Sequence, residues 1–174
     1  MEFNQTLAKR QSIRKFTEEQ ITEEQLQKLL EAANAAPVCM GQYDHLHLTV
    51  VQKPEMIAKV DEAFQKAVGD PNAHMTYCAP TLIYVSCKNE DEEIIKGCNA
   101  GVVMENMLLE ATDLGLGAVY LFGISQVLYA DEAINAMLQI PEGFRTVSAI
   151  AVGVAADETE ARSLTTERIH TTTV

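Results

Sequence analysis

Basic side chains gathered near the N-terminus are the residues whose types and spacing most clearly suggest a binding chemistry. Four of the 13 Lys and Arg residues fall within seven positions. They are Lys9, Arg10, Arg14 and Lys15, with Ser12 between them. Guanidinium groups offer forked donors that match phosphate oxygens, and a serine hydroxyl adds a short donor. This segment is therefore a candidate site for a phosphate-bearing ligand, and a solvated basic turn facing the acidic residues of 18–24 is the alternative.

Two histidines offer a second kind of chemistry. His45 and His47 alternate at the start of a predicted strand and so point to one face, with Cys39 and Asp44 close in sequence. Imidazoles at this spacing are compatible with a metal site. The alternative is that one histidine lines a ligand pocket and the other faces solvent or a gap in the core. The chain has no HExxH or CxxC motif, so we predict no metal site. Cys39 lacks the His and Asp pattern expected around a nucleophile.

The composition restricts the partners of the protein. The 174 residues fit one domain, and 47% hydrophobic residues are ordinary for a globular protein. The formal net charge of −12 repels nucleic acid phosphates and anionic membranes. We therefore expect no nucleic acid partner and no membrane partner, and any bound phosphate must be held by a local group of cations.

The cysteines and the N-terminus indicate a compartment. The four cysteines lie beside apolar residues, which predicts reduced and mostly buried thiols rather than disulfides. Residues 1–5 lack the apolar stretch of a signal peptide, and no run approaches 18 apolar residues. We expect a cytoplasmic protein.

The elements that must position these residues alternate between helix and strand. Thr22 and Gln25 form a capping-box pattern that starts a helix, which Pro37 ends. The helix at 94–114 is apolar on more than one face, which predicts packing against its own sheet and against a second subunit. Further helices are predicted at 4–10, 54–68 and 131–138, strands at 46–51, 81–87, 118–122 and 146–152, and an extended tail at 165–174.

Several ordered motifs resemble the flavin-dependent nitroreductase family. The segment from Arg10 to Phe16, RQSIRKF, is similar to the opening of these proteins, and it is followed by a helix that ends in Ala-Ala-Pro. The similarity continues in family order over nearly the whole chain, through YCAPTLI at 77–83, AGVVMENMLL at 100–109, DLGLG at 113–117, IPE at 140–142, AVG at 151–153 and Arg168.

The resemblance implies a fold and an activity. The fold would be an α+β three-layer sandwich, with a central mixed, mainly antiparallel sheet flanked by helices, formed by one domain over residues 1–174. The chain would form an intertwined homodimer with FMN at each end of the interface. The activity would be the transfer of hydride from NAD(P)H, through flavin N5, to a small organic acceptor such as a nitro compound or quinone, in a ping-pong scheme. The flavin would carry the chemistry, with no catalytic side chain.

The resemblance also assigns cofactor-binding residues. Arg10, Ser12 and Arg168 would hold the flavin phosphate, and Arg14 would approach the N1/O2 edge of the ring. Asn72 would touch the pyrimidine edge, and a loop of the opposite subunit would cover the flavin. The remaining assigned residues are Gln11 beside the phosphate-binding segment, Pro37, Val38, Cys39 and Gly41 in that loop, and Leu121, Phe122 and Gly123 where the backbone passes N5.

The loop over residues 37–45 departs from the family pattern. Of the family motif, only Pro37 survives, and Val38 and Cys39 cannot replace the hydroxyl contacts of the usual serines. This departure motivates a second hypothesis, a flavin-binding sensor or carrier with little turnover. A metal-dependent enzyme that uses His45 and His47 is a third.

Overall fold

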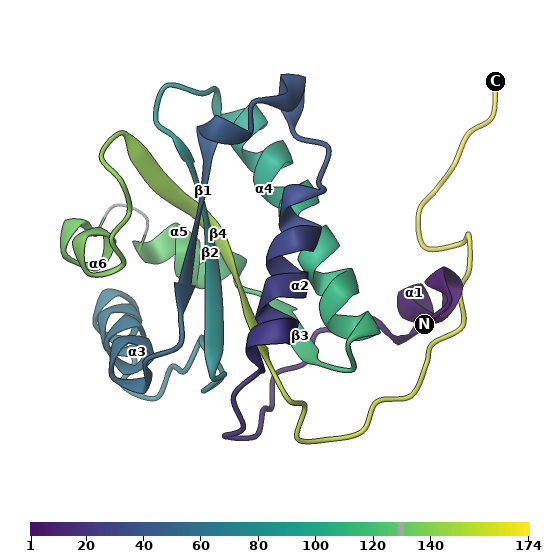
Figure 1. The fold of residues 1–174 in the computed structure, drawn as a ribbon, viewed down its shortest axis with the longest axis horizontal. Coiled ribbons are helices and arrows are strands. Elements are labelled where there is room, and N and C mark those ends of the chain that lie inside the picture. The colour runs from purple at the N-terminus through teal and green to yellow at the C-terminus, as the bar shows by residue number, and fades with distance from the viewer. Residues whose placement is uncertain (129–130) are drawn as a thin grey trace.

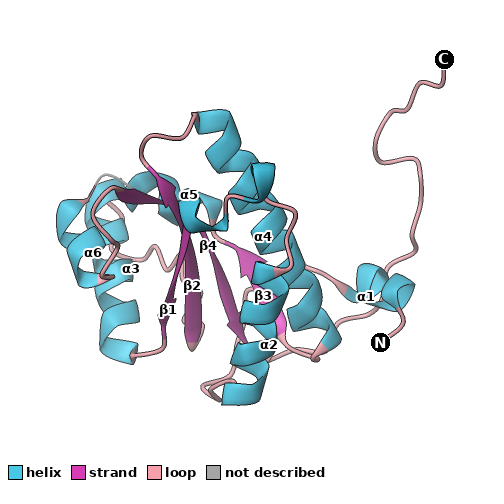
Figure 2. Cartoon of the chain, turned by 45° about the horizontal axis from the view of Figure 1, so that its top comes forward, coloured by secondary structure: helices cyan, strands magenta, loops and turns pink. Residues whose placement is uncertain are grey.

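The computed structural model describes residues 1–128 and 131–174, which form a sheet with helices on both of its faces (Figures 1 and 2). The capping box predicted at Thr22 and Gln25 is confirmed, and so are most of the predicted elements. In chain order the elements are α1 (Phe3–Lys9), α2 (Glu23–Asn34), the 3-10 helices η1 (Cys39–Gly41) and η2 (Tyr43–His45), β1 (Leu46–Val51), α3 (Pro54–Val68), β2 (Thr81–Lys88), α4 (Glu93–Asp113), β3 (Gly117–Tyr120), α5 (Phe122–Leu128), α6 (Glu132–Met137) and β4 (Phe144–Gly153).

One predicted boundary is wrong. The strand expected at 118–122 ends at Tyr120, and the helix α5 begins at Phe122. The N–H of Leu121 donates to the Ala149 oxygen at 2.8 Å, and the Leu121 oxygen then accepts from the Ser125 hydroxyl at 3.0 Å. These bonds turn the chain out of the sheet and into a helix, although Val119 to Phe122 has the composition of a strand.

The sheet has the order β1-β2-β4-β3, and every pairing between its strands is antiparallel. A parallel contact occurs only at the isolated bridge between Ser12 and Ala118, within the part of the chain that is described. The predicted α+β sandwich is confirmed. The parallel component that the prediction called mixed is thus limited to this bridge.

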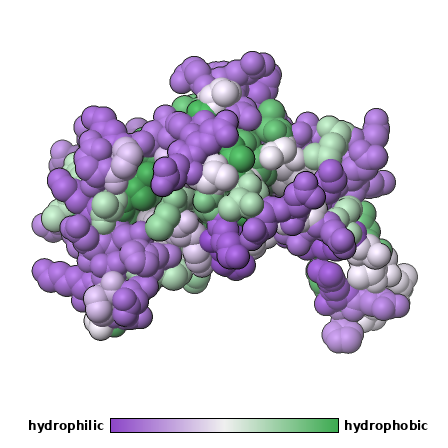
Figure 3. Space-filling model, turned by 90° about the horizontal axis from the view of Figure 1, so that it is seen from below, coloured by the Kyte–Doolittle hydropathy of each residue, from purple (hydrophilic) through white to green (hydrophobic). Residues whose placement is uncertain are grey.

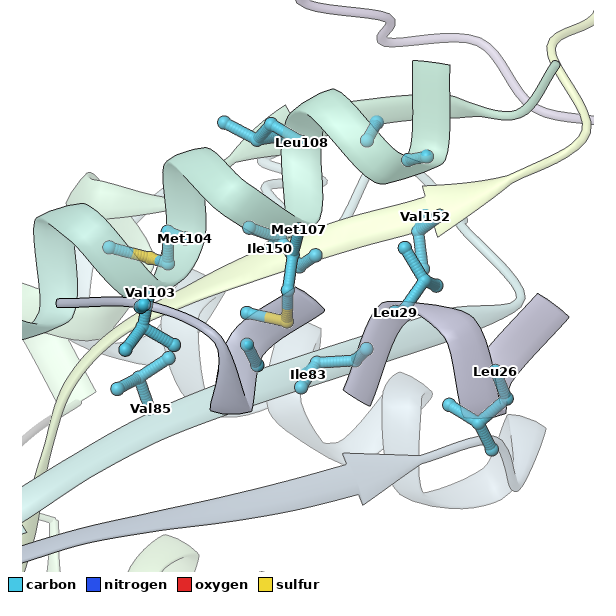
Figure 4. Packing of buried hydrophobic residues seen from close by; sticks show 14 of the residues in the cluster. Leu26, Leu29, Ile83, Val85, Val103, Met104, Met107, Leu108, Ile150 and Val152 are labelled. Atoms are coloured by element: carbon cyan, nitrogen blue, oxygen red, sulfur yellow. The ribbon is translucent and has the colours of Figure 1, made fainter. Parts of the chain in front are cut away.

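Alternate residues of the two central strands point into separate cores. Ile83 and Ile150 pack under α2 and α4, where Leu29 and Met107 meet them (Figure 4). The neighbouring residues of both strands point to the opposite face, which α3, α5 and α6 cover. Because both faces are buried, these strands read as continuous apolar runs rather than alternating ones.

Only part of the prediction about cysteines holds. All four thiols are free, but Cys87 alone is buried, while Cys78 and Cys98 are exposed and Cys39 is intermediate. Burial raises the pKa of the Cys87 thiol to about 11. None of the described helices is long and apolar enough to cross a membrane.

Two glycines allow two other segments to pack closely against one end of the sheet. Gly117 pairs with Gly153 in the β3–β4 register. A Cβ atom at Gly117 would lie 2.8 Å from Cγ2 of Ile13, and one at Gly153 would lie 2.6 Å from Cδ of Pro80. The segment that contains Ile13 and the loop that ends at Pro80 therefore lie directly on the backbone of these strands.

This packing predicts the effect of adding one methyl group. We expect Gly153→Ala to lower the free energy of unfolding by about 1–3 kcal/mol, measured by urea denaturation, because the new Cβ overlaps the Pro80 ring. Pro80→Ala removes the ring atoms that clash, so the loss caused by Gly153→Ala should be smaller in that background by about 0.5 kcal/mol or more. An equal loss in both backgrounds would contradict the proposed contact.

Candidate functional site

The predicted phosphate-binding segment is held at the edge of the sheet beside β3. The N–H of Ile13 donates to the Ala118 oxygen at 3.0 Å, and the N–H of Thr17 donates to the Val154 oxygen at 2.9 Å. Because Ser12 pairs with Ala118 in parallel, the chain runs in the same direction as β3. Beyond Arg14 the chain turns toward the end of β4, where Phe16 bridges Ala155 in antiparallel and the N–H of Ala156 donates to the Lys15 oxygen at 3.1 Å.

Arg14 presents a positive charge that is positioned by its neighbours but not neutralised by a carboxylate. Its guanidinium carbon lies 5.8 Å from the centroid of the Tyr77 ring, and Nη1 donates to the Ser12 oxygen at 3.4 Å. The side chain is exposed, and among the described residues no carboxylate oxygen lies within 4 Å of its nitrogens. Lys15, in contrast, pairs with Asp157 at 3.2 Å. Arg14 is therefore available to an anionic ligand.

The loop over residues 70–80 holds the aromatic ring under this cation. Tyr77 and Cys78 have φ angles of 55° and 53°, the left-handed region that non-glycine residues rarely adopt. The loop is fixed at Thr76, whose N–H and hydroxyl donate to the two Asp61 oxygens at 3.1 and 2.6 Å. Both residues are buried. This anchor stabilises the unusual backbone at Tyr77.

The same loop reaches the start of α5. A Cβ atom at Gly123 would lie 3.4 Å from Cε of Met75. The structure thus brings Arg14 and Gly123, two predicted site residues, to one loop segment through Tyr77 and Met75. Neither Met75 nor Tyr77 could be assigned a role from the sequence, because their contacts join segments far apart in the chain.

Two aromatic rings at the end of β3 are open to solvent. Tyr120 and Phe122 are 42% and 55% exposed, and their rings stack with centroids 6.1 Å apart. Leu121 between them is buried, and its N–H is already bonded to Ala149. The first N–H groups of a helix have no intrahelical acceptor, so Phe122 and Gly123 are the donors of this segment that a ligand can use.

The loop over residues 37–45 lies at the other end of the sheet. It leads into Leu46, which pairs with Cys87, and Cys87 pairs in turn with Arg145. This end is opposite to the pair of Gly117 and Gly153. Pro37, Val38, Cys39 and Gly41 are therefore separated from Arg14 of their own chain by the length of the strands.

The local structure of this loop leaves few free donors. Val38 is buried, and the N–H of Cys39 donates to Oδ1 of Asn99 at 2.8 Å. Met40 has a φ of 54° and is 86% exposed, and Gly41 follows with a φ of 67°. The exposed tip of the loop thus consists of Met40 and Gly41.

The C-terminal segment passes α1 but carries Arg168 beyond it. Nε2 of Gln11 donates to the Glu160 oxygen at 2.6 Å, and the N–H of Arg162 donates to the Ala8 oxygen at 3.0 Å. The two ends of the chain therefore lie side by side, and the last residues then extend away from the fold (Figure 1). Arg168 is exposed on this extended part. Its convergence with Arg10 on one phosphate stays a prediction.

The other predicted residues lie in different surroundings. Asn72 is exposed, and its N–H donates to Oδ1 of Asp70 at 2.9 Å. Nδ1 of His45 lies 2.8 Å from Oδ1 of Asp91, and the His47 ring packs edge-on against Phe144. Across residues 1–128 and 131–174, no group of three or more His, Cys, Asp or Glu is placed to hold a metal ion. The hypothesis of a metal-dependent enzyme thus gains no support.

Comparison with known proteins decides the family. A family model described as the nitroreductase family matches residues 7–154. The chain belongs to this family. It is 31% identical to a protein of Methanothermobacter thermautotrophicus over 98% of this chain and 86% of the relative, and 34% identical to one of Archaeoglobus fulgidus over 86% and 83%. Both relatives carry the name "Putative NADH dehydrogenase/NAD(P)H nitroreductase".

Solved structures share the fold of this nitroreductase-family chain. A nitroreductase with bound FMN from Bacteroides fragilis superposes with a TM-score of 0.85 at 24% identity, covering 99% of this chain and 100% of the other. A nitroreductase with bound FMN from Desulfitobacterium hafniense gives 0.86 at 21% identity, with 99% of both chains covered. These structures establish that the whole described chain has the nitroreductase fold.

Proposed function

We propose that this chain is an FMN-dependent oxidoreductase that uses NAD(P)H to reduce a small organic acceptor, and that residues 1–174 form its single flavin-binding domain. The observation that carries the proposal is the Arg14 guanidinium, which is exposed, held over Tyr77 and free of any carboxylate partner among the described residues. The names of the two archaeal relatives and the FMN bound in the two similar structures support it.

The residues at this end of the sheet fit a flavin mononucleotide. The phosphate is close to doubly charged, and Arg10 and Ser12, which belong to the same segment as Arg14, would hold it. Stacked, exposed rings at Tyr120 and Phe122 offer an apolar surface of the kind that a flat heterocycle covers. At Gly123 only the flexible end of Met75 comes near, so a ligand can approach the backbone closely.

When bound, FMN supplies the redox chemistry, by accepting hydride from NAD(P)H and passing it on. The chain contributes binding, orientation and charge. Arg14 would place a positive charge where the reduced ring becomes negative, which would favour the reduced form. The N–H groups of Phe122 and Gly123, at the start of α5, would be available as donors to the bound ring. Donor and acceptor would occupy the same pocket in turn, as in a ping-pong scheme, and no acid or base of the chain is required.

A homodimer completes the site in this proposal. The loop over 37–45 lies too far along the sheet to reach Arg14 of its own chain, so a second copy would supply its exposed tip at Met40 and Gly41. The exposed face of α4 fits such an interface, because a Cβ placed at Gly97 or Gly101 would meet no other segment of the described chain within 4 Å. Close backbone approach is thus open there, next to Ile94, which is 71% exposed.

A flavin-binding sensor or carrier is the second candidate. Buried Val38 and the Cys39 N–H, already bonded to Asn99, leave the loop with few groups for a substrate. Rapid mixing with NADH or NADPH distinguishes the two. We expect the yellow absorbance near the flavin maximum to bleach quickly if the chain is an enzyme. Colour that persists with both donors would favour the sensor or carrier.

The cofactor site can be tested by removing single charges. We expect Arg14→Ala and Arg168→Ala each to weaken FMN binding by about 1.5–3 kcal/mol, because each loses a charged hydrogen bond to the flavin. Flavin fluorescence titration of the apoprotein measures the change. Lys59→Ala, which removes an exposed charge from α3, is the matched control and should bind like the parent protein. Retention of parental affinity by both arginine variants would show that the assigned contacts are wrong.

The dimer can be tested on the exposed face of α4. We expect the parent chain to sediment as a dimer and Gly101→Glu to shift it toward the monomer, because a charged side chain would be buried without a partner. Val68→Glu adds the same charge at an exposed position at the end of α3 and should leave the dimer intact. Equal sedimentation of Gly101→Glu and the parent chain would place the interface elsewhere.

A further inference from the structure

A large cavity lies behind the loop that carries Tyr77, and the proposed flavin site does not use it. It has a volume of about 960 Å³ and lies between α3, residues 18–20 and the loop over 71–80. This volume is at the upper end of the usual range for small-molecule sites. Ile57 and Ala58 of α3 and Pro80 of the loop contribute apolar walls.

The charged groups around this cavity have one sign. Its acidic residues are Glu18, Asp61 and Glu62, and no Lys or Arg of the described chain lines it. The one basic side chain on the wall is His74, whose Nδ1 lies 3.6 Å from Oδ2 of Asp61 and which is largely exposed. A cavity with low-dielectric walls and only carboxylates concentrates a negative potential, which attracts cations.

Asp61 distinguishes this cavity from a surface cluster of carboxylates, because its side chain is buried. The residue is only 7% exposed, and Thr76 donates two hydrogen bonds to it, but no Lys or Arg neutralises it among the described residues. Buried carboxylates are usually paired with a cation. The position of its oxygens is fixed by Thr76, so a ligand would meet a carboxylate that is already oriented.

A buried hydroxyl close to Asp61 lacks a hydrogen-bond partner among the described residues. Tyr84 of β2 is 2% exposed, and its hydroxyl has no hydrogen-bond partner among the described residues. Burial and the negative charge of Asp61 raise the pKa of this hydroxyl, so it stays protonated and remains a donor. Tyr84 does not line the cavity, so Asp61 is the buried polar group that a ligand there would meet.

We propose that this cavity binds a small organic cation, an amine or amidine with an apolar body. The charged head would lie against Asp61 and the acidic rim at Glu18 and Glu62, and the apolar body against Ile57 and Pro80. The face shown in Figure 3 is mostly hydrophilic, with hydrophobic areas set between hydrophilic ones. An apolar cation combines both kinds of contact. A neutral or anionic molecule of the same shape would lack one of them.

The loop over 70–80 forms a wall of both the cavity and the proposed flavin site. His74 and Cys78 line the cavity, whereas Met75 and Tyr77 contact Gly123 and Arg14 on the other side. Thr76 between them is tied to Asp61. A cation bound in the cavity would therefore lie one loop's thickness from the proposed flavin site. The binding itself does not depend on the flavin, so it can be tested separately.

Isothermal titration of the purified protein with benzamidine tests the proposal, with benzamide and benzoate as uncharged and anionic probes of similar shape. We expect benzamidine to bind saturably and about tenfold or more tighter than benzamide, with no binding of benzoate. The double variant Glu18→Gln/Glu62→Gln should lose about fivefold or more in benzamidine affinity and keep its affinity for benzamide. Asp61→Asn keeps an acceptor for Thr76 and should show the same selective loss.

Glu55→Gln is the matched control, because it removes one charge from the first turn of α3 outside the cavity. It should leave benzamidine affinity within about twofold of the parent protein. Equal binding of benzamidine and benzamide, absence of saturable benzamidine binding, or an equal loss in Glu55→Gln would each overturn the proposal. The last result would indicate general attraction to the acidic surface. A flavin spectrum recorded on the same samples keeps this outcome separate from the failure of the proposed function.

Discussion

Close packing at the pair of Gly117 and Gly153 is the constraint on which the rest of the site depends. Two strands meet here at a point where neither has a side chain, and Ile13 and Pro80 occupy the space that two Cβ atoms would need. The basic segment and the loop over 70–80 therefore lie on one backbone surface. Arg14 directly follows Ile13, and Tyr77 lies three residues before Pro80. The Arg14 guanidinium can therefore lie over the Tyr77 ring because Gly117 and Gly153, in the strands beneath these two segments, have no side chains.

The second constraint is electrostatic and lies in the loop itself. Left-handed residues at Tyr77 and Cys78 are unfavourable, and a short surface loop has little apolar burial to offset that cost. Two hydrogen bonds from Thr76 to the buried Asp61 compensate for it. The carboxylate thus stabilises the loop that positions Tyr77, although it lies on the face away from Arg14. A strongly acidic protein can in this way use a negative charge to support a site for anions.

Local patterns in the sequence predicted most of the elements but not the contacts between them. The capping box at Thr22, the apolar strand β2 and the long helix α4 each follow from residues close together in the chain. The start of α5 could not be predicted, because it depends on a bond from Leu121 to Ala149 of a distant strand. For the same reason Tyr77 was not recognised under Arg14. The burial of Val38 also depends on α4, whose Val103 and Asn99 lie far along the sequence.

Prediction from the sequence has a second limit at residues whose proposed site needs a second chain. The loop at 37–45 and Arg168 are exposed at two ends of the described fold, and a sequence pattern can assign them roles without showing where they meet. What one chain does show is a separation of charge across a single loop. Arg14 faces one side with no carboxylate near it, and Asp61 faces the other with no Lys or Arg near it among the described residues. Opposite charges on two sides of a thin wall would favour anionic ligands on one side and cationic ligands on the other. The loop over 70–80 would then separate the binding sites of anionic and cationic ligands, and this separation would require no movement of the loop.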